Sequence, residues 1–309
     1  MRVIATTATA VLPPRVAFAR AWDHGWVAAT DHGVVVVLDA TLTVAATIDA
    51  GGPVMDVSLA DALIVADRQA LRASDPRTGA LRWRIAGEHL ACRHAGAWLW
   101  TAERRASDAL VAVARDPASG AVIREVALDD PFGGSEVMLF AHPEPGAVVA
   151  WIAAGQDGQV TYAVTAAGLR ELAPRDCLPP VFVASGETYL SMVDGALEHR
   201  RTATGAVIAT ATWPDVDDGP GDDVQWIPGG FASWASEYGR LQIVDLATMA
   251  FVDEVVIAGH PHRPFAAGDP TPSTSYAYAV PGPAGLILSV HAGGALAVTR
   301  LADWAVGAG

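Results

Sequence analysis

The 309-residue sequence contains no lysine and no asparagine, and it contains only two cysteines. The missing lysine excludes Schiff-base chemistry, and the missing asparagine excludes N-glycosylation and Asn-Gly turns. Cys92 and Cys177 have neither the spacing of a metal-binding pair nor that of a disulfide framework. We therefore expect two small buried side chains in a reducing compartment. All 20 basic residues are arginines, a bias that we interpret as the bacterial-like coding of a GC-rich genome.

Basic charge is scarce, and the formal net charge is −14. Nucleic acid is therefore not expected as a partner, because a phosphate-binding surface needs a basic footprint. A basic protein, a cationic ligand or a metal suits this charge better. Long hydrophobic runs are also missing: Ala147–Ala154 has the length of a strand, whereas a membrane span needs about 18 apolar residues.

These absences favour a cytoplasmic monomer that contacts neither nucleic acid nor membrane. The alternative is a secreted protein, if residues 1–12 act as a signal peptide, because Val3–Leu12 is apolar and follows Arg2.

A strand–turn–strand phrase recurs along the chain. Its clearest copy, Ala70–Trp83, contains an Asp-x-x-Thr-Gly turn that ends at Gly79. Equivalent glycines follow at Gly120, 41 residues later, and at Gly205, a further 85 residues on. A period in the forties with several short strands is typical of the blades of a β-propeller. The turns divide the chain into seven such units, so we predict an all-β, seven-bladed β-propeller, with six irregular blades as the alternative.

The ring of a propeller must close as one body, so residues 1–309 are expected to form a single domain. Arg2–Thr6 matches the sequence Ala206–Thr210, which is predicted to be an outer strand. We therefore expect the amino-terminal strand to pair into the last blade and to leave no open edge. The predicted blades span approximately residues 15–50, 53–86, 88–128, 136–173, 180–213, 223–257, and 274–306 together with 1–8.

The phrase Ala73-x-Asp75-x-x-Thr78-Gly79-x-x-x-Trp83 resembles the repeat of the WD-repeat and quinoprotein (PQQ-like) β-propeller superfamilies. The resemblance extends over essentially the whole chain and implies a toroidal fold, but it says little about activity. Quinoprotein dehydrogenases with this repeat use a vicinal cysteine pair and a calcium site. Neither is visible in this sequence, so no PQQ is expected. The full Gly-His and Trp-Asp signature of WD repeats is absent too.

The turns of a propeller blade, with strands lettered A to D from the axis to the rim, fall on two faces. The D–A connections and B–C turns lie on one of them, which we call the D–A/B–C face. Six of the seven predicted B–C turns carry an acid, namely Asp31, Asp67, Glu103, Asp157, Asp194 and Glu237. We interpret these acids, with His32 and the inner-strand Trp226, as a face for a protein partner or a small-molecule ligand. The alternative is turn chemistry, because aspartate before glycine favours tight turns.

The longest insertion is Ala258–Ser273, which lies on the same face and is rich in histidine. In an extended segment, His260 and His262 project to the same side. Their neighbours complete a candidate catalytic or metal-binding set that consists of His260, His262, Arg263, His291 and Glu237. Seven-bladed lyases of the streptogramin-inactivating type place histidines and acidic residues near the central channel. By analogy, these residues imply a lyase or hydrolase. The alternative is a proline-stiffened surface loop whose histidines form local hydrogen bonds.

A second possible metal site is the acidic connection 215–223. Its candidate ligands are Asp217, Asp218, Asp222 and Asp223, because Ca²⁺ prefers several oxygen ligands on a bent loop. The spacing does not match an Asp-x-Asp-x-Asp-Gly loop, so a solvated acidic loop is the alternative. Beyond such a divalent metal, calcium or zinc, no cofactor is predicted.

No nucleophile elbow, phosphate-binding loop, zinc-protease motif or dinucleotide fingerprint is present. The leading hypothesis is therefore a non-enzymatic scaffold that presents an acidic face to a protein partner. The alternative function is a small-molecule lyase or hydrolase with its centre near blades 6, 7 and 1.

Overall fold

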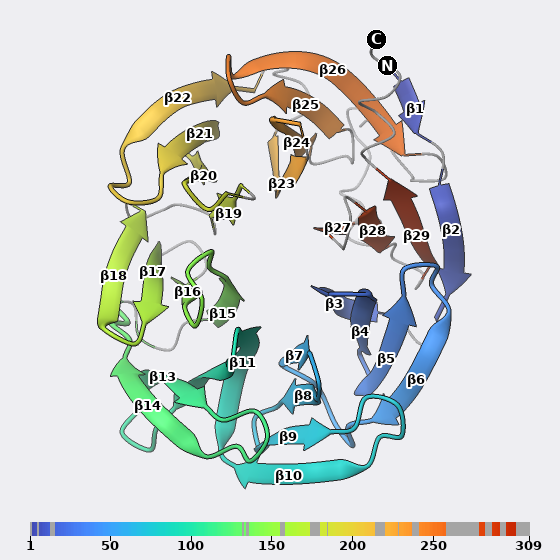
Figure 1. The fold of residues 1–309 in the computed structure, drawn as a ribbon, viewed down its shortest axis with the longest axis vertical. Helices are drawn as coiled ribbons and strands as arrows, with labels where there is room; N and C mark the ends of the chain where they lie inside the picture. The colour runs from blue at the N-terminus through green and yellow to red at the C-terminus, as the bar shows by residue number, and fades with distance from the viewer. Residues whose placement is uncertain are drawn as a thin grey trace, which may run out of the picture.

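The structure is a computed structural model. It describes residues 2–4, 6–12, 16–131, 133, 136–154, 158–173, 180–183, 185–213, 220–227, 229–236, 241–257, 278–281, 286–290 and 295–300. These residues form seven antiparallel sheets that follow one another around a ring (Figure 1). The prediction of an all-β, seven-bladed propeller is confirmed. No helix of the described residues is long and apolar enough to cross a membrane.

Each blade consists of four strands, with the first nearest the axis of the ring and the last at the rim (Figure 1). Blade 1 contains β3 (Val16–Trp22), β4 (Gly25–Thr30), β5 (Val34–Asp39) and β6 (Val44–Asp49). Blade 2 contains β7 (Asp56–Leu59), β8 (Leu63–Ala66), β9 (Ala70–Ser74) and β10 (Leu81–Ala86). Blade 3 contains β11 (Glu88–Ala95), β12 (Trp98–Arg104), β13 (Leu110–Arg115) and β14 (Val122–Ala127).

The second half of the ring repeats this order. Blade 4 contains β15 (Glu136–Ala141), β16 (Val148–Ala153), β17 (Gln159–Thr165) and β18 (Gly168–Ala173). Blade 5 contains β19 (Val181–Phe182), β20 (Thr188–Val193), β21 (Ala196–Arg201) and β22 (Val207–Thr212). Blade 6 contains β23 (Pro220–Ile227), β24 (Phe231–Ser236), β25 (Leu241–Asp245) and β26 (Ala250–Ile257). Blade 7 contains β27 (Tyr278–Pro281), β28 (Leu286–Val290) and β29 (Ala295–Arg300).

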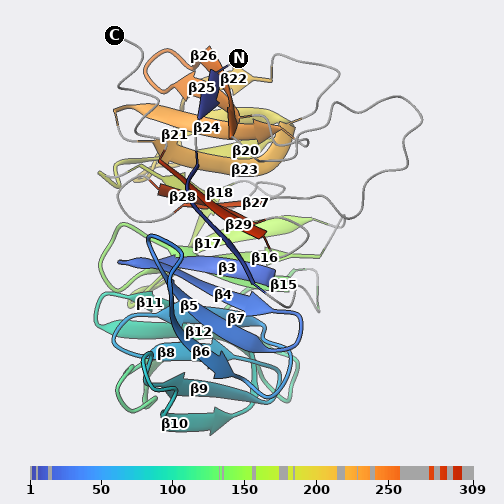
Figure 2. The ribbon, with the colours of Figure 1, turned by 90° about the vertical axis from the view of Figure 1, so that its right-hand side faces the viewer.

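The amino terminus supplies the missing outer strand of blade 7. Strand β2 (Thr6–Val11) pairs antiparallel with β29, so the blue and red ends of the chain lie side by side (Figures 1 and 2). Closure by an amino-terminal strand is thus confirmed. The preceding strand, β1 (Arg2–Ile4), pairs in parallel with β26 instead. The prediction that Arg2–Ile4 pair into the last blade is therefore wrong: these residues follow the edge of blade 6, and the closing strand begins at Thr6.

The hydrophobic core lies between neighbouring blades. The second strands are the most completely covered: all residues of β4 and β8 are buried, as expected for apolar runs with a sheet on each face. Trp26, Trp100 and Trp234 are fully buried in these second strands. The outermost strands alternate instead, as in β10. Burial thus falls from the second strand of each blade to the rim.

The recurring Asp-x-x-Thr-Gly phrase forms the C–D turn between β9 and β10. The carboxylate of Asp75 accepts hydrogen bonds from the backbone N–H groups of Arg77 and Thr78, at 3.0 and 2.9 Å. Gly79 then takes a φ of 71°, in the left-handed region that only glycine enters at little cost. The side-chain acceptor and the glycine together explain the spacing of the phrase.

The same turn contacts the neighbouring blade. In blade 3 the turn glycine is Gly120, with a φ of 73°. A Cβ atom at this position would lie 2.8 Å from Ile85 Cδ1 and 3.1 Å from Trp83 Cε3. The Trp83 indole also donates a hydrogen bond to the Pro117 carbonyl at 3.0 Å. The tryptophan that ends the phrase in blade 2 is thus seated against the turn of blade 3.

Candidate functional site

Most of the predicted catalytic and metal-binding residues lie outside the described residues. These are His260, His262, Arg263, His291, Glu237, Asp217 and Asp218, and the B–C turn residue Asp157 joins them. Asp222 and Asp223 lie in β23. Within the described ranges, no group of three or more histidines, cysteines, aspartates and glutamates is placed to hold a metal ion. The histidine-rich site and the calcium loop stay predictions.

Asp67, in the B–C turn of blade 2, is buried. Its Oδ1 atom accepts the backbone N–H groups of Gln69 and Ala70, at 2.6 and 2.7 Å, and its Oδ2 atom forms an ion pair with Arg72. These are hydrogen bonds of the kind that the turn-chemistry alternative expects. The carboxylate therefore stabilises its own turn and is not offered to solvent.

Glu103 was predicted in the equivalent turn of blade 3, but it lies in β12, just before that turn, and it is also buried. Arg115 Nη2 lies 2.6 Å from Glu103 Oε1, Thr101 donates to the same oxygen at 2.6 Å, and Arg105 Nη1 lies 3.0 Å from Oε2. Burial alone would raise the pKa of Glu103, but its contacts with His89, Thr101 and Arg115 lower it to about 2. Glu103 is therefore an anion enclosed within its blade.

The other described members of the predicted partner face belong to separate blades. Asp31 and His32 are exposed in blade 1. Asp194 is exposed in blade 5, where it and Gly195 take φ values of 49° and 74°, the left-handed pair of a type I′ hairpin turn. Trp226 is half-buried and packs against the core cluster of blades 5 and 6. The acidic face as a docking surface stays a prediction.

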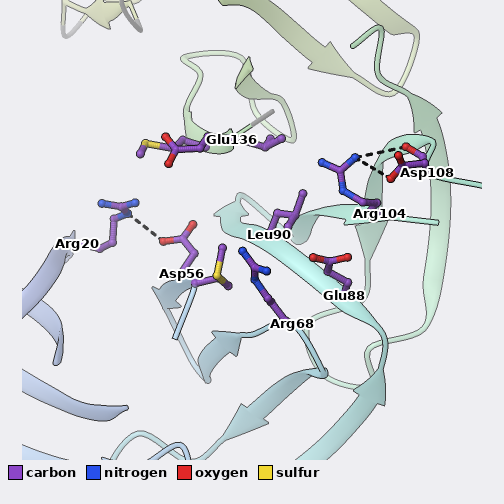
Figure 3. A pocket seen from close by; sticks show the side chains of 11 residues that line it. Arg20, Asp56, Arg68, Glu88, Leu90, Arg104, Asp108 and Glu136 are labelled. Carbon is purple, nitrogen blue, oxygen red and sulfur yellow. Dashed lines mark hydrogen bonds and ion pairs between the residues drawn. The ribbon is translucent and has the colours of Figure 1, made fainter. Parts of the chain in front are cut away.

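A cavity of about 410 Å³ lies on the D–A/B–C face, where the inner strands of blades 2, 3 and 4 begin (Figure 3). Its wall includes Glu88 and Glu136, which are the first residues of β11 and β15. Arg68 comes from the B–C turn of blade 2, and Arg104 and Asp108 flank that of blade 3. The cavity is thus on the predicted face, but at blades 2 to 4 and not at blades 6, 7 and 1.

Two ion pairs hold part of the cavity wall. Arg20 Nε lies 3.1 Å from Asp56 Oδ1, and the other oxygen of Asp56 accepts the backbone N–H of Cys92 at 3.1 Å. Asp56 therefore links the inner strands of blades 1, 2 and 3. On the opposite wall, Arg104 Nη1 lies 3.2 Å from Asp108 Oδ1 (Figure 3).

Three further charged side chains line the cavity and belong to neither of these ion pairs. Arg68, Glu88 and Glu136 have neither a hydrogen bond nor an ion pair from their side chains in the part of the chain that the structure describes. The lining also contains the apolar side chains of Met55, Leu90, Val137 and Met138. The cavity thus combines two uncompensated carboxylates, one uncompensated guanidinium and a flexible apolar lining.

Sequence reasoning missed this cavity. Glu88 and Glu136 lie 48 residues apart and share no motif, and only the ring brings blades 3 and 4 together. The one available signal was their position: both stand at the predicted start of an inner strand, on the face already singled out. Cys92, by contrast, is buried as expected, and burial raises the pKa of its thiol.

The opposite face carries a half-buried histidine, His94, at the far end of β11. His94 Nδ1 lies 3.0 Å from Ser58 Oγ, which also accepts the His94 backbone N–H at 3.0 Å. Burial, followed by the charge of Arg93, lowers the pKa of His94 to about 4. The imidazole is therefore neutral at pH 7, and it joins the inner strands of blades 2 and 3.

These sheets, their closure and their turns define the class: a seven-bladed β-propeller. The chain is similar to the crystal structure of BamB from Moraxella catarrhalis, with a TM-score of 0.62 and 14% identity over 96% of this chain and 99% of that chain. It is also similar to the Cps50 (Swd1) β-propeller domain of Myceliophteria thermophila, with a TM-score of 0.66 and 12% identity over 94% of this chain and 99% of that chain.

No family model and no curated protein sequence matches the chain. At identities of 12–14%, the two structural similarities show the fold alone. They confirm the resemblance as one of architecture, and the function has to be argued from the site.

Proposed function

We propose that this propeller is a non-enzymatic interaction scaffold that binds a basic segment of a protein partner on its D–A/B–C face. The cavity of blades 2 to 4 is the observation behind the proposal, because Glu88 and Glu136 line it and neither forms an ion pair with a described residue (Figure 3). The net charge of −14 supports it, since a long-range negative field accelerates encounters with a basic partner. The propeller fold is compatible with such a role.

The chemistry of the cavity wall favours binding over catalysis. Its described lining contains no histidine, serine, threonine or cysteine, so it offers no hydroxyl or thiol nucleophile beside an imidazole base. Its arginines and carboxylates are instead the groups that recognise charged side chains and peptide carbonyls. The lining thus supplies the charged and apolar surfaces of a peptide-binding site.

The test is quantitative affinity capture with matched baits. One bait carries Glu88→Arg with Glu136→Arg, and its control carries Asp61→Arg with Glu144→Arg in exposed A–B turns on the opposite face. Both double variants change the net charge equally, so a non-specific loss of charge affects them alike. We expect wild type and the control to enrich the same protein and the cavity variant to lose it. Equal enrichment by all three baits, or no specific enrichment by wild type, contradicts the proposal.

A further inference from the structure

We propose that the cavity of blades 2 to 4 receives a single arginine side chain of the partner. Glu88 and Glu136 accept hydrogen bonds from its guanidinium group, and Arg68 binds a carbonyl group of the adjoining peptide. This inference rests on the proposed function and names the chemical group that the same face recognises.

The net charge of the cavity favours the binding of one cation. Arg20 is paired with Asp56, and Arg104 is paired with Asp108, so these four charges cancel within the wall. Arg68, Glu88 and Glu136 leave a net charge of −1. One bound cation neutralises the site, whereas a bound anion would double its net negative charge, so the field of the cavity favours a cation.

The shape and lining favour a guanidinium on an aliphatic stem. A volume of about 410 Å³ lies in the range of sites that enclose small ligands. Met55, Leu90 and Met138 offer an apolar surface along which the methylene groups of an arginine can pack, and methionine adapts readily to its shape. Two carboxylates from different strands suit the planar, five-donor guanidinium, which is also more weakly hydrated than an ammonium group.

The wall is held in place before any ligand arrives. The backbone of Glu88 lies opposite that of Arg104 in the ladder of β11 and β12, and the backbone of Glu136 lies opposite that of Ala153 in the ladder of β15 and β16. Asp56 joins three inner strands through Arg20 and the Cys92 amide. Because the carboxylates start from paired strand positions, little backbone ordering is needed on binding.

The test uses fluorescein-labelled acetyl-Gly-Gly-Arg-Gly-Gly-amide as the probe, with citrulline or lysine in place of arginine as comparisons, measured by fluorescence anisotropy. Citrulline keeps the planar shape and removes the charge. We expect the citrulline peptide to bind at least tenfold more weakly than the arginine peptide, and the lysine peptide to lie between them. Glu88→Gln and Glu136→Gln should each weaken arginine binding about tenfold, as for the loss of one charge-assisted hydrogen bond. The control, Asp61→Asn with Glu144→Gln, should leave it unchanged.

Equal affinity for the arginine and citrulline peptides on the wild-type protein overturns the proposal, and this comparison needs no variant to fold. Tighter binding of the lysine peptide overturns the assignment to a guanidinium group. If the cavity bait loses its partner while the citrulline peptide competes as well as the arginine peptide, the scaffold proposal stands and the arginine proposal fails. If the arginine peptide binds selectively and no protein depends on the cavity for capture, only the scaffold proposal fails.

Discussion

Two glycines in equivalent turns provide a sharp test of how the blades pack. Gly79 and Gly120 have φ values of 71° and 73°, so alanine costs each about 1 kcal/mol of backbone strain. Their surroundings differ, because a Cβ at Gly79 meets only Ile48 Cγ1, at 3.4 Å, whereas one at Gly120 lies 2.8 Å from Ile85 and 3.1 Å from Trp83. Overpacking adds about 1–3 kcal/mol. We expect Gly79→Ala to lower the free energy of unfolding by about 1 kcal/mol and Gly120→Ala by about 2–4 kcal/mol.

The assay is equilibrium urea denaturation followed by tryptophan fluorescence, with far-ultraviolet circular dichroism as a second probe. Ile85→Val removes the nearest methyl group, so the cost of Gly120→Ala should be smaller in that background, and a double-mutant cycle should return a coupling energy of about 1 kcal/mol. Equal losses for Gly79→Ala and Gly120→Ala, or a coupling energy of zero, would refute the proposed seating of Trp83 and Ile85 against the turn of blade 3.

Three further predictions concern acid stability, the buried ion pairs and ring closure. The pKa of His94 is lowered to about 4, so the contribution of His94 to the free energy of unfolding is complete above pH 6.5 and falls by about 3 kcal/mol as the pH drops towards 4. Urea titrations at pH 7 and pH 4.5 should therefore show a smaller pH dependence of the free energy of unfolding for His94→Gln than for the wild type. Glu103→Gln should lower the free energy of unfolding by about 3 kcal/mol, because it leaves the Arg115 charge buried and unpaired. Glu125→Gln, at the exposed end of the ion pairs of Arg105, should lower it by less than about 0.5 kcal/mol in the same urea assay. Deletion of residues 1–11 removes β1 and β2 and exposes β29, so the melting temperature should fall much further than on deletion of residues 1–4; equal shifts would contradict closure by β2.

The fold was predictable because its turns carry local signals. Asp75 and Gly79 form a turn through their own side chain and φ angle, so their spacing repeats wherever the turn repeats. The turn pattern is weaker in blades 1 and 6, because Leu42 and Met249 take the left-handed position of the C–D turn there in place of glycine, with φ values of 64° and 53°. Both side chains are buried in the core, and that packing offsets the strain. Core contacts can therefore replace the sequence signal of a turn.

The candidate site was less predictable because its contacts are long-range. Asp67 lies in its predicted turn, whereas Glu103 lies in β12, just before its predicted turn. Arg72 and Arg115 reach these carboxylates from the next strand of each blade. Glu88 and Glu136 line one cavity only after two blades have packed together. Nothing in the local sequence distinguishes a carboxylate that will be paired from one that will be left free, since the difference depends on the side chains that the ring brings alongside.

The most direct test of the account is site-specific photo-cross-linking to the captured partner. A benzophenone side chain would replace Gln69, which is exposed beside the cavity in the B–C turn of blade 2, or Glu144, which is exposed on the opposite face. We expect a covalent adduct from position 69, lost when Glu88→Arg and Glu136→Arg are introduced, and none from position 144. An adduct from position 144 alone, or an adduct from position 69 that survives the charge reversals, would contradict it.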